Sequence, residues 1–472
     1  MLEPDWAGAL GEAYARAMDH LLGLPSRRID ARTNPAALRA ALGGPLPEAS
    51  TPAREVIAAL NAAVEPGLVA TGSGRFFGFV IGGATPAALA ADWLTSTWDQ
   101  NAGLYVTSPA AAVVEEVTGD WLRDLLNVPR HASVGFVTGA QMANFTALAA
   151  ARHEMLRRAG WDVETGGLNG APRLRIIVGA QRHDTIDRAL RFLGIGTNAL
   201  TMVPVDGQGR MMVDGLAEAL HAAERSSEPV IVCAQAGNLN TGAFDPVDAI
   251  CDLAHEVGAW VHIDGAFGLW AAASPALRYL VEGAERADSW ATDAHKWLNV
   301  PYDSGLVFCA HPAAHQAAMG VRAAYLIHSS GDDRDPLDHN PEFSRRARGF
   351  PVYAALRALG RSGVAEMVER SCTLARRFAD RLAAADGVAV LNDVVLNQVL
   401  VAFDDADPNT HTRRVMEAVR REGTCFVSGT TWEGRAVMRV SVTNWSTDEA
   451  DVDRSVDAIL AVRSQTLTRH ER

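Results

Sequence analysis

A short apolar run leads into Asp293-Ala294-His295-Lys296-Trp297, where a lysine directly follows a predicted strand. Another apolar run, further upstream, ends in Trp260-Val261-His262-Ile263-Asp264, so that a carboxylate ends a second predicted strand. The carboxyl ends of parallel strands meet at one edge of a sheet, and binding sites gather there. The sequence therefore predicts that Asp264 and Lys296 lie close together in one site.

A lysine and a carboxylate in this arrangement are what a pyridoxal phosphate site needs. The lysine amine can hold the cofactor as a Schiff base. The carboxylate can keep the pyridine nitrogen protonated, which allows the ring to accept electrons. We therefore predict a pyridoxal 5′-phosphate site in which Lys296 carries the cofactor and Asp264 faces its ring nitrogen.

Short apolar runs alternate with helical patterns over the middle of the chain, which predicts an α/β fold with a mainly parallel sheet. The predicted strands are residues 134–138, 175–179, 230–234, 259–264, 289–292 and 305–309. The predicted helices between them are residues 142–158, 183–192, 213–223 and 247–256.

Three regions are expected along the chain. Residues 1–75 are alanine-rich and helical in pattern, and we expect them to pack on another subunit or on the main body. Residues 76–350 form the large domain, and residues 351–472 form a smaller α+β domain. In the smaller domain, the pattern predicts helices to about residue 385, over 409–422 and from Thr447 onward, and strands over 394–403, 424–428 and 435–442.

Three turns that follow predicted strands carry further candidate residues. Thr138-Gly139 leads into a helix whose exposed amide groups suit a phosphate, with Gln141 and Asn144 as added contacts. His183 could stack on a flat ring and transfer a proton. Asn240 could reach the polar substituents of the ring. From the residues alone, structural alternatives remain open. The two glycine-containing sites can be ordinary turns, and His183 can be a structural histidine.

A rival interpretation is a metallohydrolase. The pairs His262 and Asp264, and Asp293 and His295, are of the residue types that bind metals. This interpretation leaves Lys296 and the Thr138-Gly139 turn unexplained, and we expect no metal.

Composition restricts the other functions. The net charge of −13 argues against a nucleic-acid partner or an anionic membrane surface. No apolar stretch reaches the roughly 20 residues of a membrane span. We expect no signal peptide, because the first residues have no basic region followed by an apolar one. The five cysteines show no paired spacing, which favours buried thiols over disulfides. We expect a cytoplasmic protein.

The chain resembles the group II family of pyridoxal-phosphate-dependent decarboxylases, which includes aromatic-amino-acid and glutamate decarboxylases. The resemblance covers most of the chain. The motifs that carry it are Arg75-Phe76-Phe77-Gly78, Thr107-Ser108-Pro109-Ala110, residues 135–144, Asn240-Thr241-Gly242, His262-Ile263-Asp264-Gly265 and residues 293–305. The resemblance implies a fold-type I (aspartate-aminotransferase-like) architecture and a homodimer with the active site at the subunit interface. The implied reaction converts an L-amino acid to an amine and carbon dioxide. The sequence leaves open whether the substrate side chain is aromatic, aliphatic or acidic, and we favour an aromatic or natural-product amino acid.

The resemblance also implies a role for individual residues. Lys296 is the Schiff-base lysine, Asp264 the partner of the pyridine nitrogen, and His183 the histidine that stacks on the ring. The remaining cofactor contacts that it implies are Ala140, Gln141, Asn240, Ala266, Asp293 and His295.

One departure from the family concerns a loop. In the family, a tyrosine on a mobile loop is thought to protonate Cα, but residues 326–348 contain no tyrosine. We expect residues 328–345 to be mobile and to close over the neighbouring subunit's site. Of the two loop histidines, His328 and His339, we take His339 as a candidate catalytic acid, because a histidine near its ordinary pKa can donate at neutral pH. The alternative is an aldehyde synthase, in which the reaction ends in oxidative deamination.

Overall fold

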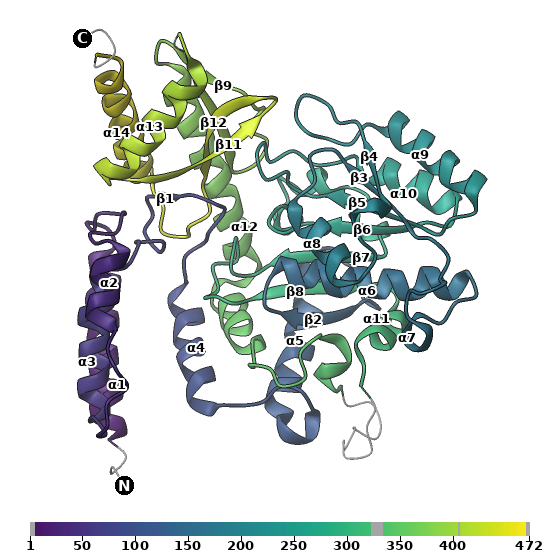
Figure 1. Cartoon of the computed structure of the whole chain (residues 1–472), viewed down its shortest axis with the longest axis horizontal. Coiled ribbons are helices and arrows are strands. Elements are labelled where there is room, and N and C mark those ends of the chain that lie inside the picture. The colour runs from purple at the N-terminus through teal and green to yellow at the C-terminus, as the bar shows by residue number, and fades with distance from the viewer. Residues whose placement is uncertain (1–4, 322–333, 405, 469–472) are drawn as a thin grey trace.

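Two sheets and a group of N-terminal helices make up the chain (Figure 1). The structure is a computed structural model and describes residues 5–321, 334–404 and 406–468. Within these residues the larger sheet has seven strands in the order β2-β8-β7-β6-β5-β3-β4. In that order, their bounds are Ser133–Val137, Gly305–Cys309, Ser289–Asp293, Trp260–Asp264, Val230–Gln235, Arg175–Gly179 and Leu200–Val203.

The larger sheet is mainly parallel, as predicted. The neighbouring strands β7, β6, β5, β3 and β4 run parallel, and β8 lies antiparallel between β2 and β7. Each predicted strand of this sheet is present, with ends that agree to within a residue. Strand β4 was not predicted; it has only four residues, of which only Val203 is buried.

Helices cover both faces of this sheet, so alternate residues of each central strand pack in different cores. Ile176 and Val178 of β3 pack with residues of α6 and α8, whereas Ile177 packs with residues of α9 and α10. A strand that is buried on both faces reads as a continuous apolar run, which is why these strands were predictable. The helices of this part are α6 (Ala140–Arg158), α7 (Val163–Gly166), α8 (Asp184–Phe192), α9 (Val213–Ser226), α10 (Val247–Glu256) and α11 (Pro312–Met319).

The carboxyl ends of three central strands lie at one edge of the sheet. Strands β5, β6 and β7 end in Gln235, Asp264 and Asp293. Helix α6 begins near the same edge, directly after the two-residue turn that follows β2. This edge therefore collects the polar side chains that the sequence singled out.

A second sheet, with helices packed on it, forms the C-terminal part of the chain. Its strand order is β1-β11-β12-β10-β9, with bounds Phe76–Phe77, Phe426–Trp432, Arg435–Ser441, Gln398–Phe403 and Val388–Val390. The helices are α12 (Gly349–Ala383), α13 (Pro408–Glu422) and α14 (Glu449–Thr468). The long helix α12 is broken at Gly360, whose φ of 63° lies in the left-handed region that glycine adopts without strain.

Strand β1 joins this second sheet, although it lies near the start of the region expected to form the large domain. Phe76 and Phe77 pair in parallel with Phe426 and Val427 of β11. A two-residue strand that pairs with a segment about 350 positions away leaves no local signal in the sequence. The domain boundaries themselves remain a prediction.

The N-terminal residues are helical, as expected, and stand beside the body of the molecule in Figure 1. Helices α1 (Trp6–Gly23), α2 (Pro35–Leu42) and α3 (Ala53–Val64) contain no buried residue. Tyr14 of α1 contacts Trp93 of α4 (Pro86–Trp98) with their rings 6.4 Å apart. These helices therefore show apolar side chains that the subunit itself does not cover. No helix in the described ranges is both long and apolar enough to cross a membrane.

A buried ion triad fastens the segment before α12 to α5 (Pro109–Leu125). The Glu115 carboxylate lies 3.0 Å from Arg334 Nη1 and 2.6 Å from Arg345 Nη1, and the side chains of Glu115 and Arg345 are fully buried. Removing one member of such a group leaves the others buried without a counter-charge. We expect Glu115→Gln to lower the free energy of unfolding by about 3–5 kcal/mol.

Urea denaturation of Glu115→Gln and of Glu116→Gln measures this effect. Glu116 is the exposed neighbour of Glu115 and serves as the matched control, for which little change is expected. A loss of less than about 1 kcal/mol in Glu115→Gln, the range of exposed ion pairs, would contradict a structural role for the triad.

Candidate active site

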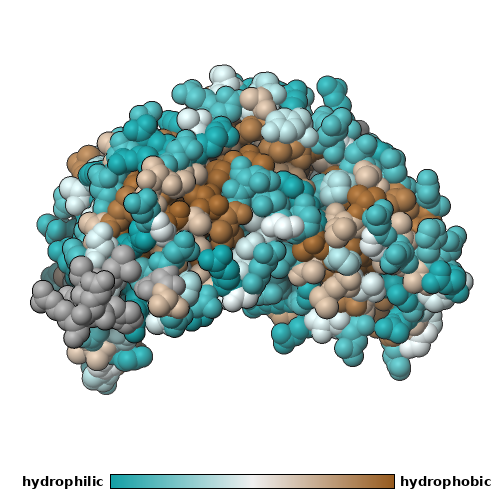
Figure 2. Space-filling model, turned by 90° about the horizontal axis from the view of Figure 1, so that it is seen from above, coloured by the Kyte–Doolittle hydropathy of each residue, from teal (hydrophilic) through white to brown (hydrophobic). Residues whose placement is uncertain are grey.

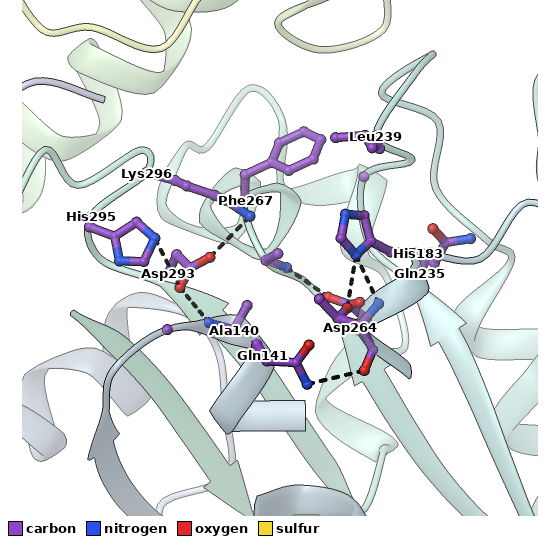
Figure 3. A pocket seen from close by; sticks show the side chains of 14 residues that line it. Ala140, Gln141, His183, Gln235, Leu239, Asp264, Phe267, Asp293, His295 and Lys296 are labelled. Carbon is purple, nitrogen blue, oxygen red and sulfur yellow. Dashed lines mark hydrogen bonds and ion pairs between the residues drawn. The ribbon is translucent and has the colours of Figure 1, made fainter. Parts of the chain in front are cut away.

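A cavity of about 210 Å³ lies at the edge where β5, β6 and β7 end. Figure 3 shows Lys296 and Asp264 on opposite sides of it, with His183 on the side of Asp264. Most of the predicted site residues line this cavity: Ala140, Gln141, His183, Asp264, Ala266, Asp293, His295 and Lys296. Residues that lie far apart in the sequence thus meet in one place, as predicted.

Lys296 presents its amine to the cavity. Its Nζ lies 3.0 Å from Asp293 Oδ2, and its side chain is 20% exposed. Lys296 is also the only lysine in the whole sequence, because the other 42 of the 43 basic residues are arginines. No other side chain of this protein can therefore form a Schiff base.

Asp264 is held from two sides at the end of β6. Asn144 Nδ2 donates to its Oδ2 at 3.1 Å, and the Ala266 backbone N–H donates to its Oδ1 at 3.3 Å. The residue is only 6% exposed and keeps access to the cavity. These bonds fix the plane of the carboxylate and leave a charged acceptor facing the cavity.

His183 caps the N-terminus of α8. Its Nδ1 accepts from the Thr185 backbone N–H at 3.2 Å and lies 2.9 Å from Thr185 Oγ1. The cap fixes the ring relative to α8 and leaves its other nitrogen, Nε2, available to a ligand.

The start of α6 forms the end of the cavity at which a phosphate was predicted. A side chain at Gly139 would meet His295, since an ideal Cβ there lies 3.1 Å from His295 Cε1. The Ala140 N–H donates to Asp293 Oδ1 at 2.6 Å, so in this structure a carboxylate already uses the positive end of the helix. Burial lowers the pKa of His295 below its ordinary value, which keeps this ring neutral at neutral pH.

Asn240 does not line the cavity, unlike its neighbour Leu239. Its Oδ1 instead accepts from Arg439 Nη1 at 3.2 Å, across the junction with β12 of the second sheet. Arg439 is 4% exposed, and burial lowers its pKa to about 10. Sequence reasoning did not single out this arginine, because it lies in an apolar strand pattern.

Most of the described part of the expected loop, residues 334–345, is buried or half-buried against its own subunit, and Phe343 and Ser344 are exposed. His328 lies outside the described residues. His339 ends a short 3₁₀ helix, Pro336–His339, and its ring contacts that of His315 on α11 at 5.2 Å. Burial, with Arg334 and His315 nearby, moves the pKa of His339 well below its ordinary value. The premise that His339 has an ordinary pKa was therefore wrong.

His315 offers a test of this buried region. It is fully buried, its Nδ1 lies 2.8 Å from Ser133 Oγ, and burial lowers its pKa to about 3. Between pH 6.5 and 3 the unfolded chain therefore binds a proton at this position that the folded chain does not bind. Stability is lost as the pH falls through that window, and by pH 4 the loss amounts to about 3 kcal/mol.

We expect His315→Gln to remove this part of the acid sensitivity. Urea unfolding at pH 7 and pH 4 measures the difference for the wild type, for His315→Gln and for His131→Gln, which replaces an exposed histidine. If His315→Gln loses as much stability as the wild type between the two pH values, His315 does not carry the effect.

The metallohydrolase interpretation does not fit this geometry. His262 and Asp264 share one face of β6, but both ring nitrogens of His262 bind protein groups, Ser289 Oγ and Asn144 Oδ1, each at 2.9 Å. In the described ranges, no group of three histidine, cysteine or acidic side chains could hold a metal ion.

The cavity does suit pyridoxal phosphate chemically. An amine that can react with the aldehyde and a carboxylate that can face the ring nitrogen lie on opposite sides. His183 borders the space between them, and the glycine turn and start of α6, the element type that suits a phosphate, line the same cavity. Phe267 and Leu239, which sequence analysis missed, add an apolar wall.

Comparison with known proteins agrees with this chemistry. Residues 35–404 match the model of the pyridoxal-dependent decarboxylase conserved domain. The chain is 28% identical over 452 residues to tryptophan decarboxylase 1 of Oryza sativa subsp. japonica, covering 90% of this chain and 87% of that protein. It is 30% identical over 332 residues to acidic amino acid decarboxylase GADL1 of Bos taurus, covering 68% and 62%.

Solved structures show the same architecture. The crystal structure of the Oryza sativa enzyme TDC with PLP and tryptamine superimposes with a TM-score of 0.92 at 26% identity, over 98% of this chain and 99% of that one. The fold-type I architecture is thereby confirmed. The chain belongs to the pyridoxal-dependent decarboxylase family, and it is a carboxy-lyase that removes carbon dioxide from an amino acid with pyridoxal 5′-phosphate as its cofactor.

Proposed function

We propose that the chain converts an L-amino acid to the corresponding amine, with Lys296, Asp264 and His183 as its catalytic residues. The observation that carries this proposal is the cavity itself, in which the only lysine of the chain and a buried carboxylate face one another. Ala140, Gln141, Ala266, Asp293 and His295 complete the cofactor site in this proposal.

Each residue acts through an ordinary interaction. Pyridoxal phosphate, when bound, supplies an electron-poor ring that takes up the electron pair left by the departing carbon dioxide. Lys296 would hold the cofactor through its amine, the only ε-amino group of the chain. Asp264 holds a proton on the ring nitrogen by pairing with it. His183, which lines the cavity, would pack on one side of the ring and limit the orientation in which the substrate carboxylate can lie.

An aromatic side chain is the proposed substrate class. Phe267 and Leu239 border the cavity and offer the apolar contact that an aromatic ring prefers. The similarity to a tryptophan decarboxylase supports the same class.

Carbon dioxide release from a panel of aromatic, aliphatic and acidic L-amino acids tests this proposal. Aromatic substrates should give the highest kcat/KM. Higher activity on aspartate or glutamate would contradict the substrate class. Failure of every amino acid, although the cofactor is bound, would contradict the reaction.

Product analysis of the best substrate decides between an amine and an aldehyde. The aldehyde synthase is kept as the second candidate, because residues 326–348 contain no tyrosine and burial lowers the pKa of the candidate acid His339 well below its ordinary value. Amine without oxygen consumption supports the first candidate. Aldehyde with ammonia and oxygen consumption supports the second.

A homodimer in the cytoplasm is part of the proposal. Trp6 and Leu22 of α1 are 73% and 74% exposed, and Trp93 and Trp98 of α4 are also exposed, which suits contact with a second subunit. Figure 2 shows further apolar residues, in brown, in the middle of the face seen from above. The five cysteines are free and buried, consistent with a reducing compartment. Sedimentation velocity should give twice the chain mass, and a stable active monomer would contradict the dimer.

A further inference from the structure

A series of buried side chains runs from Asp264 away from the cavity, on the face of the large sheet that α6 covers. Asn144 of α6 donates to Asp264, and its Oδ1 lies 2.9 Å from His262 Nε2. Ser289 Oγ lies 2.9 Å from His262 Nδ1 and accepts from Trp260 Nε1 at 2.9 Å. We call Asn144, His262, Ser289 and Trp260 the buried relay. All four are at most 1% exposed.

The order of donors in the buried relay follows from its two ends. A carboxylate can only accept, so Asn144 turns its Nδ2 to Asp264 and its Oδ1 must accept from His262 Nε2. Burial lowers the pKa of His262 to about 4, so its ring is neutral at neutral pH and carries its single proton on Nε2. His262 Nδ1 therefore accepts from Ser289 Oγ, which itself accepts from Trp260 Nε1.

The Asn144 amide is thereby set with its NH₂ group toward the active site. One hydrogen goes to Asp264 Oδ2 at 3.1 Å, and the other goes to Thr185 Oγ1 at 3.2 Å. Thr185 in turn binds His183 Nδ1. Asn144 therefore connects the carboxylate on one side of the cavity with the imidazole above it.

The buried relay has the chemistry expected of side chains that support a charged residue, here Asp264. Every donor in it points toward Asp264, and such chains of hydrogen bonds strengthen one another in a low-dielectric interior. Within the described ranges, no lysine or arginine forms a hydrogen bond or ion pair with these four residues, so the relay orients Asp264 without neutralising it. The negative charge remains available to a positive group in the cavity.

We propose that Asn144 and His262 are positioning residues, which hold Asp264 and His183 in the orientation that the reaction needs while leaving the charge of Asp264 unpaired toward the cavity. This inference rests on the proposed roles of Asp264 and His183.

The test uses the full-length, cofactor-loaded enzyme in three variants. Asn144→Leu is nearly isosteric and removes every bond of the amide. His262→Gln keeps an N–H donor toward Asn144 but loses the contact with Ser289. Thr146→Val is the matched control, because Thr146 lies fully buried on the same helix and its hydroxyl has no hydrogen-bond partner among the described residues.

We expect Asn144→Leu to lower kcat per bound cofactor by roughly 10- to 100-fold, the range found for outer hydrogen-bond partners of metal ligands. KM should change less than about twofold, because the buried relay does not touch the substrate. The pH at which the visible absorption of the bound cofactor changes should shift by at least about half a unit, since Asp264 loses a donor. His262→Gln should show smaller changes in the same direction, and Thr146→Val none.

The outcomes separate this inference from the proposed function. A wild-type enzyme that neither binds the cofactor at Lys296 nor decarboxylates an amino acid would contradict the proposed function. The inference alone would be overturned if the wild type is active and both relay variants match Thr146→Val in kcat per bound cofactor and in visible absorption. This holds even if the relay variants melt at a lower temperature. If Asn144→Leu does not fold, His262→Gln decides by the same measurements.

Discussion

Lys296→Ala is expected to eliminate both the bound cofactor's Schiff-base absorption and amino-acid decarboxylation. Because Lys296 is the only lysine in the chain, no neighbouring amine can substitute for it. Loss of the covalent attachment and of the amine that exchanges with the substrate should lower kcat/KM at least about 1,000-fold, about 4 kcal/mol in barrier height. Steady-state carbon dioxide release and the visible spectrum after incubation with pyridoxal phosphate measure the two effects.

Lys296→Arg is the control for the charge of this side chain. It keeps a cation near Asp293, which lies 3.0 Å from Lys296 Nζ, but it cannot form the adduct. We expect it to be as inactive as Lys296→Ala and to unfold like the wild type. Decarboxylation within about tenfold of the wild-type rate in either variant would remove Lys296 from the mechanism.

Asp264→Asn has the second largest expected effect, and it should separate cofactor capture from turnover. The amide is nearly isosteric, so the adduct on Lys296 should still form. It carries no negative charge, however, and cannot hold a proton on the ring nitrogen, so the ring becomes a weaker acceptor of electrons. We expect kcat to fall roughly 100- to 1,000-fold, about 3–4 kcal/mol in barrier height.

The same sample supplies the control for Asp264→Asn, because the amount of borohydride-reducible adduct reports whether the site is intact. An adduct at wild-type level together with the loss of turnover supports the assigned role. Near-normal turnover would show that the reaction does not need this charge.

The sequence predicted those parts of the fold and the site that depend on local pattern. Strands β6 and β7 are buried on both faces and read as apolar runs that end in Asp264 and just before Lys296. Since the ends of parallel strands share an edge, their meeting followed from the order of elements. The starts of α6 and α8 were also predicted from local pattern, to within two residues.

Long-range contacts could not be predicted in this way. The bond between Asn144 and His262 joins residues 118 positions apart, and no local pattern announces it. One signal was available, since His262 lies two positions before Asp264 and must share its face of the strand. The pKa of His339 could not be foreseen because it is set by burial, which depends on the packing of residues 334–345 against α11 and β2.

Borohydride reduction of the wild-type enzyme with bound pyridoxal phosphate, followed by peptide mass mapping, tests the central claim most directly. Lys296 has the only ε-amino group in the chain, so the N-terminal amine is the only competing primary amine. We predict one pyridoxyl group per chain, on the peptide that contains Lys296. This group should be lost when an amino acid that the enzyme decarboxylates is present in excess before reduction. A pyridoxyl group found only at the N-terminus, or none at all, would contradict the account.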